Sequence, residues 1–152
     1  MLDIYEELLE LVSELERENI SYALCGGLAL AVYDVIRATV DIDLLVLTQD
    51  LDNALEIAQK LGFDFLAIPM VFAQGKVQIH RASKIDSETD FPLSIDFLLV
   101  TEELRDVWAA RRRIELEGRK AWVVSRDGLI RLKMLRGSAQ DMDDIQKLGV
   151  HP

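Results

Sequence analysis

Two aspartates separated by a single residue carry the strongest chemical signal in this chain. Asp41 and Asp43 open an apolar run that ends at Leu47. Successive side chains of a strand point to opposite faces, so the two carboxylates would share one face. Mg²⁺ takes oxygen ligands and is commonly held by one or two carboxylates together with substrate phosphates. The pair therefore predicts a metal and phosphate site, although an isolated Asp-x-Asp often marks only a solvated strand end.

A pair of glycines stands upstream of these acids. Gly26 and Gly27 follow the apolar segment 22–25 and precede the apolar segment 28–33. This order predicts a strand, a glycine turn and the N-terminus of a helix. The free N–H groups and the dipole of a helix N-terminus favour phosphate, and the missing Cβ lets the backbone approach it. A plain tight turn is the alternative, because a glycine turn alone is a weak signal.

A third acid, Asp96, interrupts the apolar segment 94–100. A buried carboxylate needs a partner charge, hydrogen bonds or a metal ion. If this segment is a strand beside the one that begins at Asp41, three carboxylates converge, and two-metal phosphoryl-transfer chemistry uses such a cluster. The alternative is that Asp96 lies on the exposed face of a half-buried strand.

These residues together carry a family resemblance. The segments 22–29 and 37–46 resemble the nucleotidyltransferases of the DNA polymerase β-like superfamily. Within it they are similar in particular to the small AbiEii-type and MenT-type proteins, several of which act as toxins in toxin–antitoxin pairs. The segments 129–133 and 140–145 resemble the later lysine and aspartate motifs of that group. The resemblance extends from about residue 22 to residue 148.

The resemblance implies a transferase that moves a nucleoside monophosphate from an NTP, such as ATP, to a hydroxyl acceptor and releases pyrophosphate. It makes Asp41, Asp43 and Asp96 the catalytic residues and the ligands of Mg²⁺ or Mn²⁺. The nucleotide-binding residues that it implies, with assistance at the phosphate or acceptor side, are Gly26, Gly27, Arg37, Thr39, Lys133 and Asp141. The acceptor would be a tRNA end or a hydroxyl on a partner protein, and a cognate partner protein of a toxin–antitoxin pair is a further expectation.

Lys133 and the acids after it also follow from the sequence itself. Ser125 is a suitable N-cap for a helix that contains Lys133, whose stem would cross apolar surface while its ammonium meets a triphosphate. A solvated surface lysine is the alternative. Asp141 and Asp144 fall three residues apart, so they would share a helix face and one could pair with Lys133. The resemblance favours Asp141 for that role.

Two departures from the family pattern keep a second function open. Ser138 stands shortly before Asp141, where the family often has a basic residue, and Tyr33 and Asp34 stand where it often has a His-Gly pair. The alternative function is a non-catalytic module on the same fold that binds a nucleotide or a partner. Retention of three like-charged carboxylates argues against this alternative, because such a cluster is costly without a metal.

The distribution of charge indicates where anionic ligands could bind. The chain has a formal net charge of −10, which argues against a surface that attracts nucleic acid throughout. Residues 105–136 nevertheless hold ten basic residues against four acidic ones. This segment is either a phosphate-facing surface or a solvated face, and the sequence favours neither reading.

Length and composition set the class of fold. With 152 residues, half of them hydrophobic, we expect one domain over residues 1–152. No segment resembles a membrane span or a signal peptide, and Cys25 is the single cysteine, so we expect a cytoplasmic protein with a buried thiol.

The patterning predicts an α/β (α+β) fold with a single mixed β-sheet covered by helices and with helices at the C-terminus; the resemblance implies the polymerase β-like nucleotidyltransferase fold. Helices are expected over 1–18, 51–61 and 102–111, strands over 63–68 and 76–81, a loop over 84–90, and a hairpin over 113–124 with its turn at Gly118.

Overall fold

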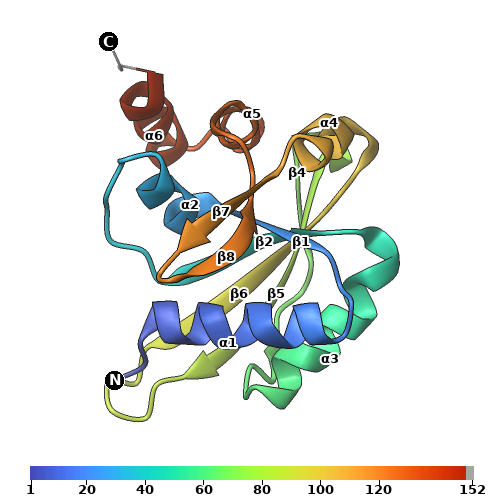
Figure 1. Cartoon of the computed structure of the whole chain (residues 1–152), viewed down its shortest axis with the longest axis vertical. Helices are drawn as coiled ribbons and strands as arrows, with labels where there is room; N and C mark the ends of the chain where they lie inside the picture. The colour runs from blue at the N-terminus through green and yellow to red at the C-terminus, as the bar shows by residue number, and fades with distance from the viewer. Residues whose placement is uncertain (150–152) are drawn as a thin grey trace.

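A mixed eight-stranded sheet forms the centre of the structure, a computed structural model that describes residues 1–149 (Figure 1). Its strands are β1 (Tyr22–Cys25), β2 (Asp41–Val46), β3 (Phe65–Leu66), β4 (Met70–Phe72), β5 (Val77–Ile85), β6 (Pro92–Leu99), β7 (Arg112–Leu116) and β8 (Arg119–Val123). The strand order is β3-β5-β6-β2-β1-β8-β7, and β4 pairs with β5. Strand β2 pairs with β6 and β1 pairs with β8 in parallel, whereas pairs such as β1–β2 and β5–β6 are antiparallel, so the predicted single mixed sheet is confirmed.

Helices cover both faces of this sheet. They are α1 (Ile4–Arg17), α2 (Gly26–Val32), α3 (Leu51–Lys60), α4 (Arg105–Ala109), α5 (Arg126–Arg136) and α6 (Ala139–Gly149), with short 3₁₀ turns at Thr48–Asp50, Ala73–Gly75 and Glu102–Leu104. Helices α1 and α3 contact each other in the lower half of Figure 1, whereas α2, α5 and α6 gather in the upper half. The predicted C-terminal helices are therefore present, and they lie on the side of the sheet that carries α2.

Local sequence explains where the main helices begin. The carboxylate of Asp3 accepts hydrogen bonds from the backbone N–H groups of Tyr5 and Glu6 and so caps α1. The hydroxyl of Ser125 accepts from Gly128 N–H and caps α5, as predicted. Helix α5 ends at Gly137, whose φ of +66° suits a glycine after a helix.

Some predicted boundaries differ from the structure. The hairpin about Gly118 is confirmed. Strand β5 extends to Ile85, so the predicted loop over 84–90 begins later, because pairing with β6 continues through Lys84. The predicted strand 63–68 shortens to two residues, and the predicted helix 102–111 becomes a 3₁₀ turn followed by the short α4.

The pairing of three neighbouring strands fixes the functional residues. Strand β2 runs parallel to β6, and Asp43 is the register partner of Asp96. Strand β5 runs antiparallel to β6 and places Arg81 opposite Asp96. On the other side of β2, Asp43 pairs with Cys25 at the end of β1. Among residues 1–149, none of the helices has the length and apolar character needed to cross a membrane.

Candidate active site

The three predicted carboxylates come from adjacent strands. Asp43 and Asp96 are 7% and 2% exposed, so Asp96 does not lie on an exposed face of its strand. Asp41 is partly exposed at the start of β2. Because Asp41 and Asp43 are two residues apart in a strand, they project from the same face of the sheet. The sequence-based expectation that the Asp96 strand lies beside the Asp41 strand is confirmed.

Asp43 is the carboxylate with the most perturbed environment. Burial, and after it the neighbouring carboxylates of Asp96 and Asp41, raise its pKa to about 7, while Arg136 and Lys133 oppose the shift. The pKa of Asp41 is also raised, first by burial, although Arg81 opposes that change. The hydrogen bonds and ion pairs found among residues 1–149 leave the Asp43 carboxylate without a donor. A buried carboxylate without a donor is energetically unfavourable, and a bound cation would stabilise it.

Gly26 allows Asp43 to take this position. Gly26 has a φ of +67°, and a Cβ built on it would lie 2.1 Å from Oδ2 of Asp43. Any larger residue would therefore be strained in the backbone and would collide with the carboxylate. Gly27 makes a different close approach, because a Cβ there would lie 2.9 Å from Oγ1 of Thr39. Each glycine of the pair thus has its own steric reason, which goes beyond a plain tight turn.

Arg81 holds the other two acids. Its Nε donates to Oδ1 of Asp96 at 2.7 Å and its Nη2 donates to Oδ2 at 2.9 Å. The same Nη2 lies 3.5 Å from Oδ2 of Asp41. The carboxylates of Asp96 and Asp41 raise the pKa of Arg81, with the hydrogen bond to Asp96 as the largest contribution. A permanent cation therefore occupies one side of the cluster.

Lys133 lies across the site from the sheet. It is 5% exposed, and its Nζ lies 2.9 Å from Oδ2 of Asp144 and 3.8 Å from Oδ1 of Asp141. Both acids therefore face Lys133 from one side of α6, as their spacing predicted, and the closer partner is Asp144. The alternative reading of Lys133 as a solvated lysine is wrong, since the side chain is buried.

Asp144 also binds Arg37. The Nε and Nη2 atoms of Arg37 donate to the two oxygens of Asp144 at 3.1 and 3.0 Å, and Gln140 donates at 3.0 Å. Burial alone would raise the pKa of Asp144, but the hydrogen bonds from Arg37 and Lys133 outweigh it and lower the pKa. This fully buried carboxylate thus ties the loop before β2 to α5 and α6.

Asp141 and Ser138 cap the last helix together. The hydroxyl of Ser138 accepts from Asp141 N–H at 3.0 Å, while Asp141 Oδ2 accepts from the backbone N–H of Ser138 at 3.2 Å. This is the reciprocal pattern of a capping box. Ser138, which departs from the family pattern, therefore has a structural role in positioning Asp141 beside Lys133.

The donors suit a hard divalent cation only in part. Carboxylate oxygens are the ligands that Mg²⁺ and Mn²⁺ prefer. Among residues 1–149, however, no three His, Cys, Asp or Glu side chains are arranged to hold a metal ion. Arg81 explains this, because it binds both oxygens of Asp96. The residues present fit an ion held by Asp41 and Asp43 and completed by substrate phosphates.

The space beside Asp43 is narrow. A cavity of about 20 Å³ is bounded by Gly26, Asp43, Lys133, Arg136 and other residues of β1, β6, α5 and α6. Ligand sites usually have volumes of about 300–1,000 Å³, so a nucleotide bound at Asp43 would extend well beyond this cavity. Larger hollows of about 490 and 580 Å³ lie beside α4 and beside the turn at Ala73–Gly75, away from the three carboxylates.

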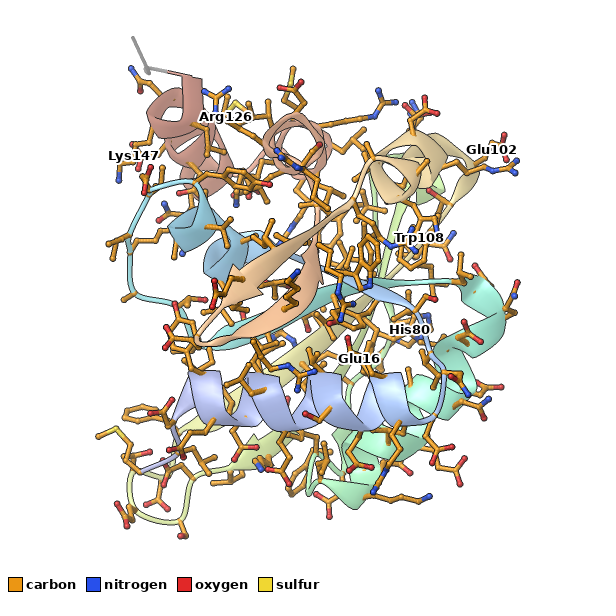
Figure 2. All side chains as sticks on the ribbon, in the orientation of Figure 1. Glu16, His80, Glu102, Trp108, Arg126 and Lys147 are labelled. Atoms are coloured by element: carbon orange, nitrogen blue, oxygen red, sulfur yellow. The ribbon has the colours of Figure 1, made fainter. Side chains whose placement is uncertain are left out.

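Half of the basic residues in the segment 105–136 form ion pairs with acids of the same chain. Ion pairs join Arg105 to Glu102, Arg113 and Arg119 to Glu16, Arg131 to Glu103, and Lys133 to Asp144. Glu16 is labelled on α1 in Figure 2, where side chains of the hairpin approach it. Trp108, also labelled there, lies under the guanidinium of Arg111 at 4.0 Å. Half of the segment's ten basic residues are thus paired with acids of the same chain, and the buried Lys133 is one of them.

Comparison with known families is decisive for the class of protein. Residues 1–151 match the family described as "Nucleotidyltransferase of unknown function (DUF6036)". The chain belongs to this nucleotidyltransferase family. The superfamily expected from the sequence is therefore confirmed, whereas the finer AbiEii or MenT subtype is not shown. A comparison with curated protein sequences gave no significant match.

Solved structures show the same fold in other nucleotidyltransferases. The candidate nucleotidyltransferase TM1012 from Thermotoga maritima is 16% identical with a TM-score of 0.65, covering 95% of this chain and 91% of its own. The lincosamide antibiotic adenylyltransferase LnuA is 17% identical with a TM-score of 0.61, over 95% and 96% of the two chains. ANT(2″)-Ia in complex with adenylyl-2″-tobramycin is 14% identical with a TM-score of 0.65, over 94% and 86%. At these identities the similarity establishes the nucleotidyltransferase fold.

The sequence singled out the carboxylates, the glycine pair and Lys133 that the structure brings together, but it did not indicate that Arg81 and Arg136 lie beside them. Nothing in the spacing of Arg81 distinguishes it from other basic residues, and only the register of β5 with β6 places it opposite Asp96. Cys25 is buried as expected, and burial raises the pKa of its thiol, which suits a structural residue rather than a nucleophile.

Proposed function

We propose that this protein transfers a nucleoside monophosphate from an NTP, such as ATP, to a hydroxyl acceptor. The acceptor oxygen would bond to the α-phosphorus, the bond from that phosphorus to the bridging oxygen would break, pyrophosphate would leave, and the hydroxyl proton would pass to solvent. Asp41 and Asp43 would hold Mg²⁺ or Mn²⁺. When bound, the ion would neutralise phosphate charge and lower the pKa of the attacking hydroxyl.

The observation that carries the proposal is the state of Asp43. Its carboxylate is buried, lies beside two other acids and receives no donor among the described residues. Such repulsion is expensive unless a cation and a phosphate complete the site. Gly26 leaves room for that arrangement by lacking a Cβ next to Oδ2 of Asp43.

Basic residues would bind the triphosphate. Lys133 and Arg136 border the cavity next to Asp43, so both can approach an anion bound there. In the structure, Lys133 and Arg37 both form ion pairs with Asp144. Positioning and charge neutralisation of this kind carry most of the rate enhancement in phosphoryl transfer. Gly27 and Thr39 shape the loop that leads into β2, and Asp141 orients Lys133.

For the acceptor we propose a tRNA end or a hydroxyl on a partner protein, in the setting of a toxin–antitoxin pair. The family resemblance supports this choice, and basic side chains such as Arg112, Lys120 and Arg126 offer sites for an anionic acceptor. Small polyhydroxylated molecules are the competing acceptor class, because LnuA, which shares the fold, is named a lincosamide antibiotic adenylyltransferase and ANT(2″)-Ia is described in complex with adenylyl-2″-tobramycin.

A labelling experiment tests the proposal. The purified protein is incubated with each α-³²P-labelled NTP, Mg²⁺ or Mn²⁺, and one acceptor preparation at a time: total tRNA, a protein extract, or a panel of aminoglycosides and lincosamides. We expect label on tRNA or protein and its loss in Asp43→Asn. Nucleotide binding without transfer to any acceptor would instead favour the non-catalytic module.

A further inference from the structure

Arg81 and Asp96 form a two-point ion pair in the candidate site. They are direct cross-strand partners between β5 and β6, so the backbone register alone brings them together. The guanidinium meets both carboxylate oxygens, at 2.7 and 2.9 Å. This two-point geometry is the strong form of an arginine–carboxylate pair.

The exposure of the two partners differs. The side chain of Asp96 is 3% exposed, whereas that of Arg81 is 34% exposed. Asp96 therefore depends on its partner for charge compensation, since a buried carboxylate without one is costly. Arg81 is the more exposed partner, so its guanidinium has access to solvent while it binds the buried acid.

Arg81 also approaches Asp41, at 3.5 Å, while Asp43 receives no donor from residues 1–149. One guanidinium thus compensates two of the three acids in the cluster and leaves the third uncompensated. A divalent cation at the same place would need the oxygens that Arg81 now binds. The two cations compete for the same carboxylates.

We propose that Arg81 is a resident counter-cation that competes with the divalent metal ion for Asp96 and Asp41. The nucleotide-free protein accordingly binds a divalent ion weakly, through Asp43 and Asp41. Asp96 becomes a ligand only when Arg81 leaves it. This inference rests on the proposed function, since that function assigns the metal to these acids, and it adds a residue that controls metal affinity.

The affinity of the protein for Mn²⁺ without nucleotide tests the proposal independently of turnover. The concentration of free Mn²⁺ is measured from its electron paramagnetic resonance signal. The proteins are wild type, Arg81→Gln, Asp96→Asn and the double variant. We expect Arg81→Gln to tighten Mn²⁺ binding by about tenfold or more, because the two hydrogen bonds from the guanidinium to Asp96 are lost. In the Asp96→Asn background the same change should give less than about threefold, since the released ligand is absent.

Arg131→Gln is the matched control, because Arg131 pairs with Glu103 on the surface at 2.7 Å. It should leave Mn²⁺ affinity within about twofold, as expected for an exposed pair. The proposal is wrong if Arg81→Gln has the melting temperature of the wild type but binds Mn²⁺ no more tightly. It is also wrong if Arg81→Gln increases Mn²⁺ affinity by the same factor in the Asp96→Asn background.

Arg81→Lys provides a second variant in case Arg81→Gln does not fold. Its ammonium cannot span both oxygens of Asp96, so it should tighten Mn²⁺ binding in the same direction by a smaller factor. Unchanged or weaker binding by folded Arg81→Lys would also overturn the proposal. Failure of this proposal can be distinguished from failure of the proposed function. If the wild type transfers nucleotide but the Arg81 variants bind Mn²⁺ no more tightly, only the competition between Arg81 and the metal ion is overturned.

Discussion

A Cβ on Gly26 would lie 2.1 Å from Oδ2 of Asp43, so the glycine and the catalytic candidate have to be considered together. Gly26 follows β1 as the first residue of α2, and the pairing of Asp43 with Cys25 places the acid next to it. This contact explains why α2 begins with a glycine even if no phosphate is bound. It also makes the glycine a sensitive position for mutation.

Gly26→Ala should lower both stability and activity. A positive φ costs an L-residue about 1 kcal/mol, and the collision with Asp43 adds to that. We expect a total loss of about 2–4 kcal/mol in the free energy of urea unfolding. Gly118→Ala is the control, because Gly118 has a φ of +83° and nothing within 4 Å of its Cβ position. Equal losses in the two variants would contradict the proposed collision.

Asp43→Asn should stabilise the metal-free protein above neutral pH. The pKa of Asp43 in the folded protein is about 7, above its unfolded value, so the folded state holds a proton that the unfolded state has released. Stability from this group is present at low pH and is lost as pH rises through about 7. Asn keeps the neutral form at every pH.

The stabilisation by Asp43→Asn relative to wild type should therefore grow between pH 4.5 and pH 8, by on the order of 1–3 kcal/mol. Thermal melts in metal-free buffer measure it, at about 2–4 °C for each kcal/mol. Asp64→Asn, at an exposed position, is the control and should show no such growth. A pH-independent difference for Asp43→Asn would show that Asp43 is not held among repelling charges.

Asp144→Ala should be strongly destabilising. It leaves the buried ammonium of Lys133 without its nearest partner and releases Arg37. Removal of one member of a buried ion pair costs about 3–5 kcal/mol. Asp143→Ala is the matched control, because exposed Asp143 pairs with Lys147, four residues on, and its loss should cost less than about 0.5 kcal/mol. Similar unfolding midpoints for the two variants would exclude Asp144 as the anchor of Lys133.

The sequence predicted the parts of the site that depend on local spacing. Asp41 and Asp43 share a face because strands alternate, and Ser125 caps α5 because its neighbours favour a helix there. Cross-strand relations were less accessible. Arg81 meets Asp96 only because β5 and β6 pair through Ile85 and Pro92, and the sequence of the intervening loop does not specify that register.

The choice between Asp141 and Asp144 shows the same limit. Both acids lie on the face of α6 that meets Lys133, so their helical spacing was informative. The angle at which α6 meets α5 decides which acid is closer, and that angle depends on packing between distant segments. Strand β5 is longer than predicted for a related reason, because its backbone pairing with β6 continues through Ile85.

Paired reactions with α- and γ-labelled NTP test the central claim most directly. Wild type and Asp43→Asn are incubated with Mg²⁺ and the acceptor preparation that accepts label. We expect the α label on the acceptor, the γ label in released pyrophosphate, and transfer reduced by at least about 100-fold in Asp43→Asn. Label from the γ position on the acceptor, or full transfer by folded Asp43→Asn, would contradict the assignment of this site as a nucleotidyltransferase centre.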